Sequence, residues 1–264
     1  MSLTGKIAIV IGGARGIGRG IVLIHCSHDK KQPPNQILQV AFTYVSPSSK
    51  AHAEALVREV ESLGSSAYAI QADAACLSSP EAVMSSTLTA FNVSHLDILV
   101  NNAGLGSAGT RIEEITSDEF DKIMAVNVRA FISMTQAFIP YARLGGRIVN
   151  LSPISARGGY ATQSVYSASK AADEALTRVW ATELGQKYNI TVNAVNPGPV
   201  DTDMYRAAGE VHLARMKEQD RKTPAAPRAS TEDDVAEIVA FLCEERSRWI
   251  TGEVVCANGG MFYT

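Results

Sequence analysis

Short apolar runs rich in β-branched residues alternate along this chain with longer stretches in which apolar residues recur every three or four positions. The first run, at 6–11, ends in glycines, which is typical of a buried parallel strand. Further strands are predicted at 37–44, 66–73, 96–104, 145–152, 189–198 and 253–260. Helices are predicted at 50–64, 79–92, 117–143, 163–187 and 230–245. This alternation predicts an α/β fold in which a doubly wound parallel sheet carries helices on both faces.

We expect a single domain over residues 1–264, because no linker, repeat or low-complexity segment interrupts the alternation. Two segments depart from the regular pattern. Residues 25–36 are polar and contain Pro33-Pro34, which predicts a short first helix followed by an irregular connection. Residues 200–229 follow the sixth strand and carry many charges. A long insertion at this edge of a parallel sheet is often a lid, so a substrate lid is predicted there.

The overall charge argues against several kinds of partner. A formal net charge of −3 gives no reason to expect nucleic acid or an anionic membrane surface. No basic N-terminal region precedes a long apolar stretch, so no signal peptide is expected. No window approaches about 18 unbroken apolar residues, so no transmembrane helix is expected either. The predicted partner is a small-molecule substrate.

The four cysteines are widely scattered, with no C-x-x-C spacing, so a structural zinc site is not expected. Their distribution fits reduced thiols in a cytoplasmic protein. The cluster His25, Cys26, His28 and Asp29 superficially resembles a metal site. No second group of ligands accompanies it, so we interpret it as a solvated loop and predict no metal.

A glycine-rich turn follows the first predicted strand and opens the first helix. Gly12, Gly16 and Gly18 give the spacing G-x-x-x-G-x-G. Glycine permits a tight turn, and the missing Cβ lets a pyrophosphate approach the N-terminus of the helix. In this strand–turn–helix context the turn predicts a dinucleotide site.

The end of the second predicted strand indicates which dinucleotide is bound. A carboxylate there would bind the ribose hydroxyls of NAD and repel a 2′-phosphate, yet residues 43–53 contain no Asp or Glu. Serine hydroxyls and the guanidinium of Arg15 stand in its place and suit a phosphate. We therefore predict NADPH. The residues expected to contact it in these two segments are Arg15, Ile17, Tyr44, Ser46 and Ser48.

Tyr166 and Lys170 form a pair that is suited to proton transfer. They are four residues apart in a predicted helix and so share one face. A free tyrosine, with a pKa near 10, is a poor acid–base catalyst at neutral pH. A nearby ammonium stabilises the phenolate, so we expect Lys170 to lower the pKa of Tyr166.

Several motifs occur together in one order along the whole chain. They are the glycine turn, Asn-Asn-Ala-Gly at 101–104, Asn127, Tyr166-x-x-x-Lys170 and NPGPVDT at 196–202. As a set they closely resemble the classical short-chain dehydrogenase/reductase family. The resemblance implies a Rossmann fold of about seven parallel strands. It also implies a homo-oligomer, a tetramer or dimer built on the two long helices at about 117–143 and 163–187.

The resemblance assigns roles to individual residues. Tyr166 would be the proton donor, Lys170 would also hold the nicotinamide ribose, and Asn127 would position a water behind Lys170 for a proton relay. Asp73 would lie at the adenine edge of the cofactor. The other cofactor contacts implied are Asn102, Ala103, Gly104, Pro197, Gly198, Val200 and Thr202.

The chain departs from the family pattern at the position thirteen residues before Tyr166, where the family usually has an active serine. Pro153 occupies this position, and proline has no side-chain donor. Because side chains alternate at a strand end, Ser152 is expected to point away from the pocket. Ser155 is expected to project toward it if the loop reshapes around Pro153.

A second departure is Ile11, where the family usually has a threonine that braces the glycine turn, so we expect this turn to be less rigid.

Loss of an oxyanion donor typically costs about 2.7–4 kcal/mol in barrier height. Three hypotheses follow. Ser155 replaces the missing serine in a carbonyl reductase, or the substrate is a protonated imine that needs no such donor, or the reaction is a non-redox cyclisation or isomerisation. The principal prediction is an NADPH-dependent reductase that transfers hydride to a C=O or C=N group of a secondary metabolite. A catalytically impaired NADP(H)-binding protein is a further alternative.

Overall fold

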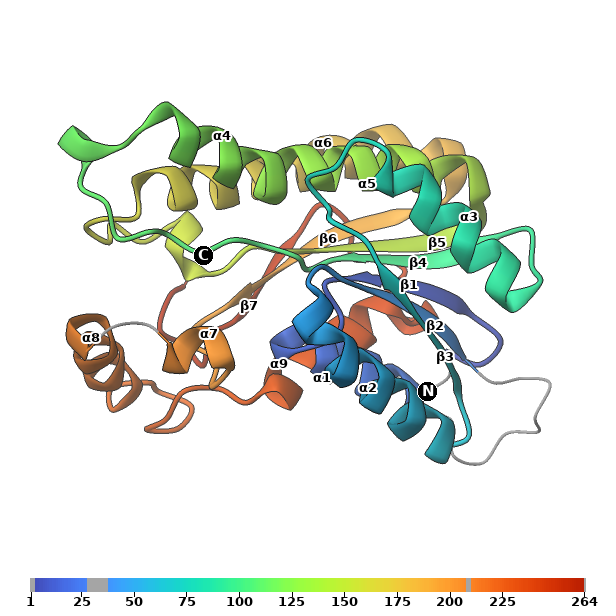
Figure 1. Ribbon diagram of the computed structural model, residues 1–264, viewed down its shortest axis with the longest axis horizontal. Helices are drawn as coiled ribbons and strands as arrows, with labels where there is room; N and C mark the ends of the chain where they lie inside the picture. The colour runs from blue at the N-terminus through green and yellow to red at the C-terminus, as the bar shows by residue number, and fades with distance from the viewer. Residues whose placement is uncertain (1–2, 28–37, 208–209, 264) are drawn as a thin grey trace.

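The computed structural model describes residues 3–27, 38–207 and 210–263. Seven parallel strands form its single sheet in the order β3-β2-β1-β4-β5-β6-β7 (Figure 1). This is the doubly wound order predicted from the alternating pattern. The strands are β1 (Ile7–Ile11), β2 (Gln39–Tyr44), β3 (Ser66–Gln71), β4 (Leu96–Asn101), β5 (Ala142–Leu151), β6 (Thr191–Pro197) and β7 (Val254–Ala257).

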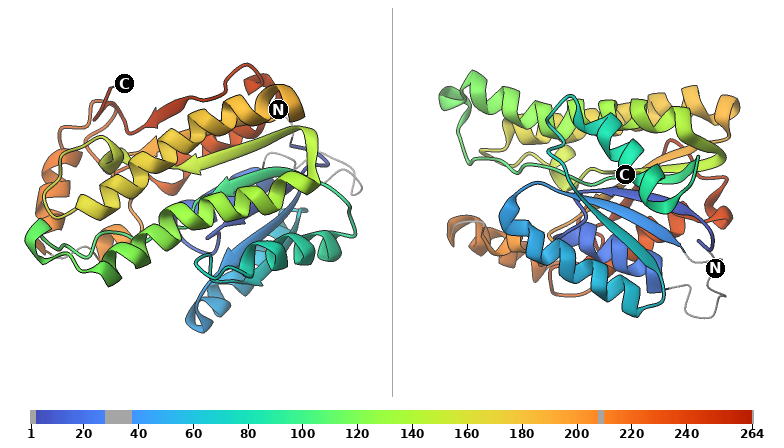
Figure 2. Two further views of the ribbon diagram at one scale, coloured as in Figure 1. Left: turned by 90° about the horizontal axis from the view of Figure 1, so that it is seen from above. Right: turned by 45° about the vertical axis from the view of Figure 1, so that its right-hand side comes forward.

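Helices cover both faces of the sheet, as Figures 1 and 2 show. One layer contains α1 (Gly16–Ser27), α2 (Lys50–Ser62) and α9 (Glu232–Cys243). The other contains α3 (Ser79–Phe91), α4 (Ser117–Met124), α5 (Ala130–Phe138) and α6 (Ser164–Tyr188). Successive residues of β1 face opposite layers. Ala8 and Val10 join the first core, whereas Ile7, Ile9 and Ile11 join the second, which explains why the central strands are apolar at every position.

Side chains and glycines fix several helix ends. Thr231 caps α9, where its hydroxyl accepts from the backbone N–H of Asp234 and the Asp234 carboxylate accepts in return from the backbone N–H of Thr231. Beyond α2, Gly64 has a φ of +83°, which the preceding helical residues could not adopt without strain. These local signals explain why the predicted helix boundaries agree closely with the structure.

The predicted long helix at 117–143 is a composite. It contains α4, a π-helical turn η4 (Ala125–Arg129), α5 and a final 3-10 turn η5 (Ile139–Tyr141) that includes Pro140. By length and composition this stretch could cross a membrane. In the structure Phe131 and Phe138 are buried in the core on one side of the sheet, so one face of the stretch packs against the sheet.

The two irregular segments are partly described. Helix α1 extends to Ser27 and so includes residues 25–27 of the predicted irregular connection, whereas 28–37 lie outside the described residues. The predicted lid contains α7 (Asp203–Arg206) and α8 (Glu210–Asp220), which follow β6. The Tyr205 hydroxyl donates to an Asp220 carboxylate oxygen over 2.6 Å and ties the two helices together.

Candidate active site

The glycine turn between β1 and α1 has the geometry of an anion cradle. Gly12 and Gly16 have φ values of +78° and +57°, which favour glycine. A Cβ at Gly18 would lie 2.1 Å from the Gly12 carbonyl oxygen, so only glycine fits there. The turn therefore brings backbone N–H groups and the N-terminus of α1 to one bare surface, which fits the pyrophosphate of a dinucleotide.

Thr43 of β2 braces this turn. The Gly12 N–H donates to the Thr43 hydroxyl over 2.8 Å, and the Gly13 N–H donates to the Thr43 carbonyl over 3.0 Å. With Ile11 in place of the usual threonine, we expected a less rigid turn. That expectation did not consider this contact from the neighbouring strand. Thr43 is only 3% exposed. In the sequence, Thr43 could be recognised only as a hydroxyl-bearing residue near the end of an apolar strand.

The loop after β4 closes the cradle from the side. The Asn102 amide donates to the Gly12 carbonyl over 2.8 Å, and Ala103 packs directly against Gly12. A Cβ on Gly104 would lie 3.5 Å from Asn127 Oδ1 and 3.7 Å from Lys170 Nζ. The missing side chain at Gly104 thus leaves the backbone of this loop next to both polar groups.

The end of β2 places polar groups at the expected phosphate position. Tyr44 ends the strand, and the Ser46 hydroxyl lies 2.8 Å from that of Ser48 and 2.9 Å from that of Ser49. Arg15 is exposed within the glycine turn, and Ile17 follows in α1. Asp73 is exposed just beyond β3, where its carboxylate accepts from the Ala75 N–H over 2.9 Å.

The segment after β6 comes back to the glycine turn. Pro197 ends β6, and Gly198 packs against Asn258 and Met261 near the C-terminus. Val200 is buried and pairs with Ser230 in an isolated bridge. Thr202 caps α7, and its methyl would lie 3.3 Å from a Cβ on Gly16. The predicted cofactor residues of these segments thus lie near the carboxyl ends of β1, β2, β3, β4 and β6, the edge of the sheet where Rossmann folds bind dinucleotides.

Tyr166 and Ser155 meet at the start of α6. Pro153 precedes the 3-10 turn η6 (Ile154–Ala156), which carries Ser155, 6% exposed, to the tyrosine. Burial raises the pKa of the Tyr166 phenol to about 12, and the adjacent Ser155 side chain opposes this rise. Ser152 instead points away, as alternation predicted, and donates to the Lys170 carbonyl over 2.8 Å.

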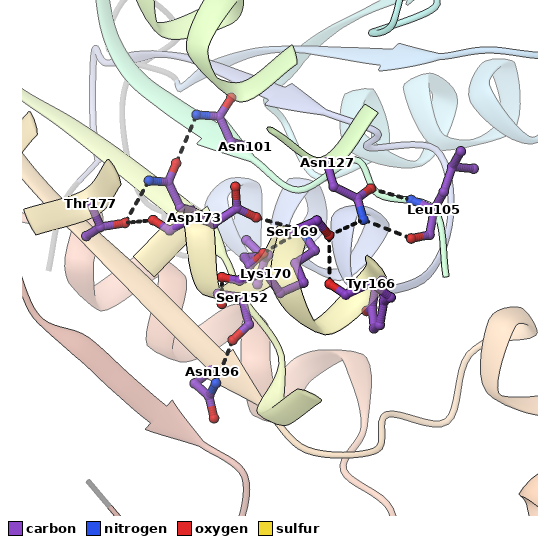
Figure 3. Close-up of polar contacts among 12 residues, drawn as sticks. Asn101, Leu105, Asn127, Ser152, Tyr166, Ser169, Lys170, Asp173, Thr177 and Asn196 are labelled. Carbon is purple, nitrogen blue, oxygen red and sulfur yellow. Dashed lines mark hydrogen bonds and ion pairs between the residues drawn. The ribbon is translucent and has the colours of Figure 1, made fainter. Parts of the chain in front are cut away.

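Lys170 is held by groups other than Tyr166. Its ammonium donates to the Leu151 carbonyl and to the Asp173 carboxylate, each over 3.0 Å, as Figure 3 shows. The lowering of the Tyr166 pKa by Lys170 stays a prediction. Burial raises the pKa, and the negative charge of Asp173 raises it further. Sequence reasoning missed Asp173, because an acid one turn beyond Lys170 looked like an ordinary helix-surface residue.

Asn127 lies in the π-helical turn η4, a distortion that is frequent at functional sites. Its Oδ1 accepts from the Leu105 N–H over 2.8 Å, and its Nδ2 donates to the Leu105 carbonyl and to the Ser169 hydroxyl, each over 3.0 Å (Figure 3). The amide thus joins the loop after β4 to α6 and places both beside Lys170. The water relay expected of Asn127 stays a prediction.

Known proteins resemble this chain over nearly its full length. A family model described as enoyl-(acyl carrier protein) reductase matches residues 12–262. The short-chain dehydrogenase/reductase FrzI of a Cladobotryum species is 43% identical, with 98% of this chain and 97% of that protein covered.

Solved structures agree with this relationship. A blue fluorescent protein from a metagenomic library, in complex with NADPH, is 38% identical with a TM-score of 0.88 and full coverage of both chains. A short chain dehydrogenase from Burkholderia cenocepacia J2315, in complex with NADP, is 38% identical with a TM-score of 0.86 and 98% of each chain covered. The seven-stranded sheet, the glycine cradle and these matches show that this chain belongs to the short-chain dehydrogenase/reductase family.

Proposed function

We propose that this protein is an NADPH-dependent reductase that transfers hydride to the carbonyl carbon of a small molecule, with Tyr166 as the proton donor. Two observations carry the proposal: the Ser155 side chain lowers the pKa of the Tyr166 phenol, and the glycine cradle fits a dinucleotide. A carbonyl oxygen bound there would meet two hydroxyl groups. The Ser155 hydroxyl can donate a hydrogen bond to the negative charge that develops on this oxygen, and the Tyr166 hydroxyl can deliver a proton.

The choice of NADPH rests on the residues at the end of β2. No carboxylate lies between residues 43 and 53, and the hydroxyls of Ser46 and Ser48 face one another there. The Arg15 guanidinium would pair with a 2′-phosphate. Two of the similar solved structures are complexes with NADPH and NADP, which supports the same choice.

The bound cofactor would supply the hydride, and the protein supplies position and the proton. Gly12, Gly16 and Gly18 would hold the pyrophosphate. Lys170 would hold the nicotinamide ribose from beside Gly104. Because the pKa of Tyr166 is raised to about 12, its hydroxyl is protonated at neutral pH, as a proton donor requires.

The substrate would enter beneath the lid. Arg215 of α8 stacks over the Tyr160 ring, with 5.8 Å between the guanidinium carbon and the ring centroid. A cavity of about 190 Å³ lies beside this contact, lined by Tyr160, Gln219, Lys222, Pro224, Gly260, Met261 and Phe262. An aromatic wall and a helical cover suit a secondary metabolite with a ring system, and we propose this substrate class.

The homo-oligomer is also a proposal. Phe120 of α4 and Val179 of α6 are 48% and 51% exposed, on the two long helices that family members commonly pair. Light scattering on the purified protein distinguishes a dimer or tetramer from a monomer.

A substrate screen tests the proposed function. The protein is incubated with NADPH and a panel of cyclic ketones, diketones and cyclic imines, and both product and absorbance at 340 nm are followed. Ketone reduction with equal loss of NADPH is expected. Reduction of imines alone would favour the hypothesis in which no oxyanion donor is needed. Product without loss of NADPH would indicate a non-redox cyclase, and cofactor binding without any turnover would indicate an impaired enzyme.

A further inference from the structure

Thr162 lies just before α6 in a backbone conformation that threonine rarely adopts. Its φ is +69°, in the left-handed region, where a β-branched side chain is strained. The other non-glycine residues with positive φ in the described part of the chain are Asn92 and Asn189, and asparagine tolerates this region. The strain at Thr162 therefore indicates that contacts with another part of the molecule hold this residue in place.

A serine from the loop after β4 makes such a contact. The Ser107 hydroxyl donates to the Thr162 carbonyl, and its oxygen accepts from the Gly109 N–H over 3.1 Å. The second bond orients the hydroxyl, because an oxygen that accepts from Gly109 keeps its own proton for Thr162. Ser107 thus joins two segments of the candidate active site that are far apart in the sequence.

The first turn of α6 lacks the usual cap. Gln163 occupies the N-cap position, and its side chain makes no capping hydrogen bond to any described residue. The first turn of the helix, as described, also contains no acidic residue. The first N–H groups of α6 are therefore without two common sources of stabilisation. Tyr166 lies in this turn, so its position depends on contacts from outside the helix.

The loop after β4 follows the part of α6 that carries Tyr166. At one end of this stretch, a Cβ on Gly104 would lie 3.7 Å from Lys170 Nζ. At the other end, the Ser107 hydroxyl binds Thr162. In the sequence, Tyr166 stands midway between Thr162 and Lys170. The hydrogen bond from Ser107 therefore helps to set how the loop and the tyrosine lie relative to one another.

We propose that Ser107 is a positioning residue that ties the uncapped first turn of α6 to the loop after β4 and so holds Tyr166 where it can protonate the substrate. The inference rests on the proposed function, in which Tyr166 is the proton donor. The strained backbone at Thr162 presents its carbonyl to Ser107, and the hydrogen bond offsets part of the strain. Without this bond the first turn would move more freely. The distance between the phenol and the substrate oxygen, on which proton transfer depends, would then vary.

Hydrogen exchange followed by mass spectrometry tests the tie in the whole chain without relying on turnover. In Ser107→Ala, the amides of residues 167–170 should exchange about 3–10-fold faster, the effect expected when one hydrogen bond is lost. Ser107→Thr keeps a hydroxyl and should restore slow exchange. Ser85→Ala is the matched control, since the Ser85 hydroxyl donates to the Ala82 carbonyl over 3.2 Å within α3, and it should leave α6 unchanged. Unchanged exchange in Ser107→Ala would overturn the proposal.

Thr162→Gly tests the strain separately. Glycine adopts a positive φ freely and keeps the carbonyl that Ser107 binds. The melting temperature should therefore rise by about 2–4 °C, because the strain of the threonine is relieved. An equal or lower melting temperature would show that Thr162 is not strained and would contradict the inference.

Kinetics decide whether the tie serves proton transfer. With the ketone that is reduced fastest, Ser107→Ala should lower kcat by about 10–100-fold and raise the solvent isotope effect on kcat, because the phenol is less well placed. The NADPH dissociation constant should not change, and Ser107→Thr should restore kcat. Faster exchange with a wild-type kcat would overturn the positioning role. Faster exchange in a protein whose wild-type form reduces no ketone would contradict the proposed function instead and leave the tie to α6 in place.

Discussion

Ser155 acts on the Tyr166 side chain from a 3-10 turn that begins directly after Pro153, and its side chain lowers the pKa of the phenol. Position 153 therefore carries no hydroxyl at the strand end, and Ser155 in the following turn supplies one instead. This contact favours a carbonyl substrate, because two hydroxyls at one point suit an oxygen that gains negative charge.

Ser155→Ala should lower the turnover number for ketone reduction by about 10²–10³-fold, the usual effect of losing one oxyanion donor. NADPH affinity should not change, because Ser155 lies outside the glycine cradle. Steady-state kinetics and calorimetric titration with NADPH measure the two quantities. Turnover equal to that of the wild type would exclude Ser155 as the replacement donor.

Pro153→Ser in the Ser155→Ala background tests whether the two positions serve the same oxygen atom. The new hydroxyl stands at the strand end from which the family usually donates. We expect it to restore at least part of the lost turnover, measured with the ketone reduced fastest in the screen. No recovery in a correctly folded double variant would show that position 153 no longer faces the substrate oxygen.

Arg15→Ala should weaken NADPH binding by about 10–100-fold, which corresponds to a lost hydrogen bond between charged groups. NADH binding should be unaffected, because NADH has no 2′-phosphate. Arg19→Ala is the matched control, since Arg19 lies four residues further on, in α1, and pairs with Glu59 over 2.7 Å. Equal losses for the two cofactors in Arg15→Ala would argue against a phosphate contact.

Asp234→Asn should destabilise the fold by about 1 kcal/mol at pH 7, because it weakens the cap of α9. Hydrogen bonds from Arg228 lower the pKa of Asp234 to about 2. A carboxyl whose pKa is lowered on folding stabilises the protein above its unfolded value, about 4, and loses that contribution as the pH falls through its folded value. The difference between wild type and variant in urea unfolding should therefore shrink between pH 7 and pH 3. A difference that is constant with pH would contradict this account.

Sequence patterns predicted the fold because short apolar runs such as β1 alternate with amphipathic stretches, and because some helix boundaries have a local signal. Thr231 before α9 and Gly64 after α2 are examples that depend only on nearby residues. The glycine turn was predicted for the same reason. It is a local structure whose steric demands appear directly in the residue types.

The electrostatics of the site could not be predicted in this way. Asp173, Ser155 and Thr43 act through contacts between elements, or through burial, that no spacing reveals. A Tyr-x-x-x-Lys pair predicts that two side chains share a helix face. It does not predict that the buried Asp173 accepts a hydrogen bond from the lysine ammonium, or that burial raises the pKa of the tyrosine.

The most direct test of the central claim is the Tyr166→Phe variant, which removes one hydroxyl and keeps the ring. Stopped-flow absorbance at 340 nm measures NADPH oxidation with the best ketone, and calorimetry measures NADPH binding. Turnover should fall by about 10²–10⁴-fold, the usual contribution of a general acid, while the NADPH dissociation constant stays unchanged. Full turnover in a folded Tyr166→Phe protein would contradict the assignment of Tyr166 as the proton donor.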